Sequence, residues 1–190
     1  MRARVLIVIL ALAACSKKPG PDEILRRYTD ATLHGRVEEA WPLLCAKDRA
    51  YRPLAAMQDA AKAFDQPNVK TIIGKTRFEI TQTKIDGDRA LATEKLIGPD
   101  VKKISSTAAA DPAIAAKVQS LPPAEAMAYG QKLLADALAA PDCPMAATEQ
   151  TLTLLRENGE WKVVADFEGH DRREREKDPV LRDLEGQPPQ

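Results

Sequence analysis

The sequence predicts an α+β fold, because the spacing of its apolar residues changes from helical to strand-like along the chain. Apolar side chains recur at helical spacing in residues 21–64 and at alternate positions in residues 77–97 and 149–167. Each strand-like region contains a tight-turn dipeptide, Asp86-Gly87 in the first and Asn158-Gly159 in the second. The chain is therefore predicted to form N-terminal helices followed by two antiparallel hairpins.

The N-terminal region is predicted to form three helices. The first begins at Pro21, where a proline and two acidic residues suit a first turn, and ends at Gly35. The second covers residues 37–44, and Pro42 is expected to kink it or to delay its start. The third is rich in alanine and runs from about residue 53 to residue 64.

Two hairpins are predicted, with a helical insertion between them. The first hairpin pairs residues 77–81 with residues 90–97, and the second pairs residues 149–156 with a strand that begins at Trp161. Residues 101–146 are rich in alanine and proline, and we interpret them as a helical insertion and not as a second domain.

Residues 21–168 are predicted to form one domain, and residues 169–190 a charged, flexible tail. The tail contains the run "HDRREREKD" followed by a proline-rich end, a composition that does not build a core. The predicted core consists of apolar residues on the inward side of each element: Ile24, Tyr28, Trp41, Phe78, Ile80, Leu91, Leu152, Leu154, Trp161, Val163 and Phe167.

The first residues of the chain predict export. Arg2 and Arg4 precede an unbroken apolar run from Val5 to Ala14. This run is too short to span a bilayer, which needs about 20 helical residues, and it fits the apolar part of a signal peptide. Residues 1–14 are therefore interpreted as a signal peptide.

The end of this run, Leu12-Ala13-Ala14-Cys15, resembles the lipobox of bacterial lipoproteins. The resemblance implies cleavage before Cys15 and attachment of acyl chains, palmitate among them, to that cysteine. Two or more acyl chains give stable membrane anchoring. Residues 15–20 would then be the lipidated cysteine and a tether. Ser16 in place of aspartate favours the outer membrane, facing the periplasm, over the inner membrane.

The two cysteines that remain, Cys45 and Cys143, are predicted to form a disulfide, because exported thiols usually pair. The alternative is two free thiols, one of them buried in a helix. A metal site is not expected, since the chain has no CxxC motif and its only histidines are His34 and His170.

Composition and motifs exclude several function classes. The chain has 28 basic and 28 acidic residues, and removal of Arg2 and Arg4 leaves a formal charge of −2, which does not suit nucleic-acid binding. Aromatic residues make up only 4%, too few for a base-stacking surface. No Ser-His-Asp spacing and no glycine-rich phosphate loop is found, so neither a catalytic triad nor a cofactor is expected.

Two stretches resemble the small, often lipid-anchored members of the nuclear-transport-factor-2-like superfamily. They are "PDEILRRYTDATLHGRVEEAWPLL" and "TLTLLRENGEWKVVADF". The resemblance implies a cystatin-like cone, in which a curved antiparallel sheet wraps the first long helix, and a pocket at its open end. We expect Tyr28, Trp41 and Trp161 to line that pocket. Family members use it as an isomerase or dehydratase site, as a ligand site, or as a surface for docking or dimerisation.

These observations favour a lipid-anchored, non-enzymatic binding or docking domain for a protein partner or a small apolar ligand. One alternative is a small isomerase or lyase, which would need a carboxylate base and a tyrosine or protonated acid inside the cone. Glu94 and Glu149 could each point inward or outward, and no base is paired with them. Another alternative is an accessory subunit of an envelope or secretion assembly. A homodimer is also compatible with the fold.

Overall fold

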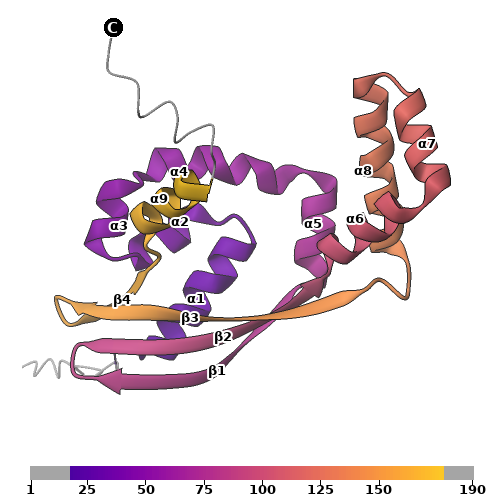
Figure 1. The fold of residues 1–190 in the computed structure, drawn as a ribbon. Helices are drawn as coiled ribbons and strands as arrows, with labels where there is room; N and C mark the ends of the chain where they lie inside the picture. The colour runs from indigo at the N-terminus through magenta and orange to yellow at the C-terminus, as the bar shows by residue number, and fades with distance from the viewer. Residues whose placement is uncertain (1–17, 178–190) are drawn as a thin grey trace, which may run out of the picture.

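The computed structural model describes residues 18–177 and shows an α+β fold with a four-stranded antiparallel sheet in the order β1-β2-β3-β4 (Figure 1). The strands are β1 (Arg77–Asp86), β2 (Arg89–Pro99), β3 (Met145–Glu157) and β4 (Glu160–Val164). The helices, with the short 3-10 helices η1 and η2, are α1 (Pro21–Leu33), α2 (Val37–Ala40), η1 (Trp41–Leu43), α3 (Ala46–Tyr51), α4 (Leu54–Ala61), η2 (Lys62–Asp65), α5 (Pro67–Lys75), α6 (Val101–Ala110), α7 (Pro112–Ser120), α8 (Pro123–Ala139) and α9 (Phe167–Lys177).

Helix α1 begins and ends as predicted and packs against the sheet. Its buried apolar residues, Ile24, Leu25, Tyr28 and Ala31, lie on one side because they recur at helical spacing. The chain leaves the helix through Gly35, whose φ of 66° is a left-handed conformation that glycine adopts without steric cost.

The predicted second helix is broken at Pro42, and two helices of the N-terminal region, α3 and α5, were not predicted. Helix α2 stops at Ala40, and the chain continues through η1, because proline has no N–H to donate to the preceding turn. Helix α3 is short and largely polar, which left no periodic signal. Helix α5 begins at Pro67, just beyond the predicted end of the third helix, and proline suits a first helical position.

Both predicted hairpins form, and the second turns at the predicted Asn158-Gly159, whereas the first turns at Gly87-Asp88, one residue later than predicted. Asp86 pairs with Arg89 across a two-residue turn, and Glu157 pairs with Glu160 across Asn158-Gly159. Asn158 and Gly159 have φ of 51° and 76°, the conformation that a type I′ hairpin turn requires at both positions. Strand β2 also pairs with β3, so the two hairpins form one continuous sheet.

The side of β2 that faces the helices was predicted wrongly. Leu91 is 38% exposed, whereas Ala90, Ala92 and Glu94 are buried. Successive strand residues point to opposite faces, so placing Leu91 inward reversed the whole strand. The two alanines allow α1 to approach the sheet closely, and this makes small residues better suited to the position than leucine.

Most of the remaining predicted core is confirmed. The buried members are Ile24, Tyr28, Leu154, Trp161 and Val163. The members that are partly buried and pack against this core are Trp41, Ile80, Leu152 and Phe167. Phe78 is also partly buried. The predicted core did not include Leu25, Leu44 or the buried alanines, although Leu25 and Ala31 lie on the helical stripe of α1.

The insertion is helical, as predicted, and consists of α6, α7 and α8 (Figure 1). It leaves and rejoins the sheet at one end of the β2–β3 ladder, where Pro99 pairs with Met145 and the Asp100 N–H donates to the Pro144 carbonyl at 2.8 Å. Helix α8 packs against α5, and the Asn68 side chain donates to the Gln131 carbonyl at 3.1 Å. The insertion is thus joined to the main helical layer as well as to the sheet.

The predicted flexible tail is wrong for residues 169–177, which belong to α9. This helix packs against α3, and its Asp171 accepts a hydrogen bond from Arg52 at 2.6 Å. Lys47 pairs with Glu168 at 2.9 Å. Charged residues of α9 therefore pair with residues on α3 and immediately after it. The local composition of the run did not predict these pairs. Residues 178–190 of the predicted tail lie outside the described residues.

The predicted disulfide between Cys45 and Cys143 is wrong, because both thiols are free. The Cys45 N–H donates to the carbonyl of Val163, which pairs with Leu154 on β3. Cys143 lies just before Met145, nine residues away along β3, or about 30 Å at the rise of a strand. A disulfide needs Cα atoms within about 7 Å.

Cys15 and the predicted signal peptide lie outside the described residues.

Candidate functional site

One cavity of about 390 Å³ lies between α1, the sheet and α9. We call it the Glu94 cavity. Of the three residues expected to line a pocket, Tyr28 lines this one. Trp41 and Trp161 line none of the three cavities described in this section. Trp41 instead donates its indole N–H to the Arg52 carbonyl at 3.1 Å, and Trp161 is buried beneath the Arg156 guanidinium.

Glu94 is the feature of this cavity that sequence reasoning did not resolve. Its side chain is 2% exposed, and its two oxygens accept hydrogen bonds from the Thr29 hydroxyl at 2.6 Å and the Gln150 amide at 2.5 Å. Both donors are neutral. Ala90, Ala92 and Glu94 occupy alternate positions of β2, so their side chains lie on one face of the strand. This spacing was the pattern from which the orientation of Glu94 could have been predicted.

Tyr28 contributes a neutral hydroxyl to the same cavity. Burial raises the pKa of Tyr28 to about 12, and the negative charges of Asp48 and Glu94 add to the effect of burial, while Arg52 opposes it. Tyr28 and Glu94 are thus the two kinds of group that the isomerase alternative requires. The enzymatic alternative stays a prediction.

The raised pKa of Tyr28 predicts a loss of stability in alkali. Between pH 10 and pH 12 the unfolded chain releases the Tyr28 proton and the folded chain keeps it, so the free energy of unfolding falls as pH rises. We expect Tyr28 ionisation to contribute about 2–3 kcal/mol to that fall. The difference in absorbance at 295 nm between the wild type and Tyr28→Phe, followed against pH, should give a midpoint near 12. A midpoint near 10 would contradict the burial of this hydroxyl.

Arg52, His170 and Asp171 lie at the same cavity. The Arg52 guanidinium donates to Asp171 at 2.6 Å and stacks 4.5 Å from the centre of the Phe167 ring. The hydrogen bond from Arg52 holds the pKa of Asp171 below its usual value. Among the described residues that line this cavity, Arg52 is the one permanent positive charge, and its guanidinium is engaged by Asp171 and the Phe167 ring.

A second and larger cavity, of about 720 Å³, lies within the insertion between α6, α7 and α8. We call it the insertion cavity. Its walls are mostly apolar, and the large apolar side chains among them are Ile104, Ile114, Val118, Leu133 and Leu134. Asp111 is the one charged residue there, and its carboxylate caps α7 by accepting hydrogen bonds from the N–H groups of Ala113 and Ile114. Apart from this capping carboxylate, the lining residues of the insertion cavity carry no charge.

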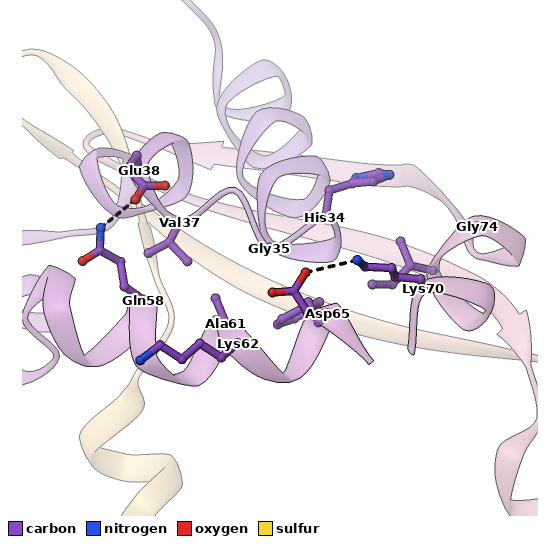
Figure 2. A pocket seen from close by; sticks show the side chains of 12 residues that line it. His34, Gly35, Val37, Glu38, Gln58, Ala61, Lys62, Asp65, Lys70 and Gly74 are labelled. Carbon is purple, nitrogen blue, oxygen red and sulfur yellow. Dashed lines mark hydrogen bonds and ion pairs between the residues drawn. The ribbon is translucent and has the colours of Figure 1, made fainter. Parts of the chain in front are cut away.

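A third cavity, of about 570 Å³, lies between the end of α1, α2, α4 and α5. Figure 2 shows that its charged side chains engage neighbours: Gln58 donates to Glu38 at 2.6 Å, and Lys70 pairs with Asp65 at 3.1 Å. Lys62 pairs with Asp59 at 2.7 Å. His34 also lines this cavity, but its Nδ1 lies 2.8 Å from the Asp30 carbonyl of the same helix. These pairings favour a structural surface over a binding site.

Within residues 18–177, no three histidine, cysteine, aspartate or glutamate side chains gather in a way that could hold a metal ion. None of the helices in this part of the chain is both long and apolar enough to cross a membrane. Comparisons of the chain with protein-family models, curated protein sequences and solved structures found no match.

Proposed function

We propose that this chain is a lipid-anchored protein of the cell envelope that binds a small apolar ligand without transforming it. The observation that carries this proposal is the insertion cavity. Its volume of about 720 Å³ lies within the range of small-molecule sites, roughly 300–1,000 Å³, and its walls are predominantly apolar, as in such sites. Apolar surface of this kind gains free energy when a ligand replaces water.

The small side chains of the insertion explain how a cavity remains between three helices. Ala108, Ala115 and Ala137 line it at positions where larger residues would fill the space. The helices are also attached at several points, through the Asp100–Pro144 hydrogen bond and through the packing of α8 on α5. These attachments oppose collapse of the helices into the empty volume.

The anchoring part of the proposal rests on the lipobox-like segment that ends at Cys15. Lys18, close to that cysteine in sequence, donates to the Gly159 carbonyl at 3.3 Å, in the β3–β4 turn. The insertion lies at the opposite end of β3, a strand of 13 residues or about 40 Å. A lipid on Cys15 would therefore attach the sheet end of the domain and leave the insertion cavity remote from the attachment point.

The proposed fold is the cystatin-like cone that the sequence resemblance implied. Support comes from the packing of α1 against β1, β2 and β4, and from the Glu94 cavity beside that helix. A long helix covering the apolar face of an antiparallel sheet is the arrangement that such a cone requires.

A cavity-filling substitution tests the proposed ligand site. Ala137→Phe places a ring in the insertion cavity, and we expect it to weaken binding of the neutral fluorescent probe N-phenyl-1-naphthylamine at least tenfold, or about 1.4 kcal/mol. The matched control is Ala135→Phe, on the exposed side of the same helix, which should bind the probe like the wild type. Fluorescence titration measures both. Equal binding by the two variants, or no binding by the wild type, would refute the proposal.

A further inference from the structure

We propose that the Glu94 cavity is a second ligand site, separate from the insertion cavity, and that it binds the ammonium group of a small organic amine. The site would consist of the Glu94 carboxylate as the charged partner and of aromatic and aliphatic walls that hold the body of the amine. Nothing in this proposal depends on the ligand of the insertion cavity.

The first argument is that Glu94 has no cationic partner. Among the residues that the structure describes, no lysine, arginine or histidine nitrogen forms an ion pair with it. Its hydrogen-bond donors, Thr29 and Gln150, carry no charge. A carboxylate group can accept about four hydrogen bonds, so each oxygen retains capacity for another donor. Burying a carboxylate is costly unless it is paired, and an ammonium ligand would supply the missing charge.

The second argument is the charge and shape of the cavity. Its charged residues are Glu94, Asp171 and Arg52, which leaves a net charge of −1 when His170 is neutral. Asp48, buried near Tyr28, adds a further negative charge to the surroundings. Leu96 and Leu152 line the cavity with Tyr28 and Phe167. Aromatic rings attract organic cations, and aliphatic side chains favour the apolar part of an amine.

The third argument favours an organic ammonium group over a calcium ion as the ligand. Calcium takes six to eight oxygen ligands, usually from several carboxylates. Around Glu94 the described residues offer no group of three acidic, histidine or cysteine side chains. An ammonium group needs only one strong acceptor together with a few weaker ones, and the cavity of about 390 Å³ is large enough for its organic body.

The test compares two probes of nearly equal shape, benzylamine and benzyl alcohol, by isothermal titration calorimetry of the full mature chain at pH 7. We expect benzylamine to bind at least about tenfold more tightly than benzyl alcohol, because hydrogen bonds to charged groups are the stronger kind. In Glu94→Gln, which keeps the shape and removes the charge, this preference should disappear. The matched control is Glu149→Gln, which makes the same change at an exposed position of the neighbouring strand β3. This variant should retain the preference for benzylamine.

A second variant keeps the test informative if Glu94→Gln does not fold. Thr32 lines the cavity, and its hydroxyl bonds only to carbonyls of its own helix. Thr32→Phe should therefore preserve α1 and exclude both probes. Equal affinity of the wild type for the two probes, no binding of benzylamine, or benzylamine binding that survives Thr32→Phe would each overturn the proposal. Binding of N-phenyl-1-naphthylamine in the insertion should be unchanged in these variants, which separates this result from the proposed function.

Discussion

Replacement of Asp48 by alanine is expected to destabilise the protein by about 3–5 kcal/mol and to release α9 from the domain. Asp48 is 2% exposed, and its carboxylate accepts hydrogen bonds from the N–H groups of Ala165, Asp166 and Phe167 at 2.8, 3.3 and 3.1 Å. The Cys45 thiol donates to the same carboxylate at 3.1 Å. Alanine would leave these donors without an acceptor in a largely buried turn.

Urea denaturation measures this loss of stability, and hydrogen exchange of the α9 amides measures the release of the helix. Asp142→Ala, at an exposed position of the insertion, is the matched control and should change the free energy of unfolding by less than about 0.5 kcal/mol. Asp48→Asn keeps one acceptor oxygen and should fall between the two. If Asp48→Ala were as stable as the control, the β4–α9 turn could not depend on this carboxylate.

Two adjacent leucines of β3 are expected to respond very differently to the same truncation. Leu154 is fully buried against α1 and β4, whereas Leu155 points to the other face of the sheet and is 37% exposed. Leu154→Ala removes buried methyl groups and leaves a cavity, so we expect a loss of about 2–5 kcal/mol. Leu155→Ala should cost less than about 1 kcal/mol, because Leu155 lies on the face of the sheet away from the core and is already 37% exposed.

Thermal or urea denaturation of the two variants checks the face of the sheet that the helices cover. Similar losses for Leu154→Ala and Leu155→Ala would mean that both faces of β3 are buried, for example by a second copy of the chain. A larger loss for Leu155→Ala would reverse the orientation of the strand. In either case the positions of Ala92 and Glu94 on the neighbouring strand would need revision, because their side chains share the face of Leu154.

Local sequence patterns were enough to predict the α+β order, the two hairpins and the helical insertion. These features depend on local physics. Asn158 and Gly159 both adopt positive φ, and this selects a type I′ turn whatever surrounds it. The spacing of apolar residues distinguishes helical segments from strands. The first helix and most of the predicted core follow from the same signals, because large apolar residues on one side of an element must be covered.

The candidate sites and the positions of the small and charged residues depend on contacts between segments that are distant in sequence. Ala92 and Glu94 are buried because α1 covers that face of β2, and the charged run after Gly169 is helical because Asp48 and Arg52 lie opposite its first turns. Cys45 and Cys143 remain free because nine residues of β3 separate the ends at which they lie. In each case the outcome depends on residues that are far away in sequence. Local patterns record propensity and hydropathy, whereas burial of a polar group depends on which distant donors reach it.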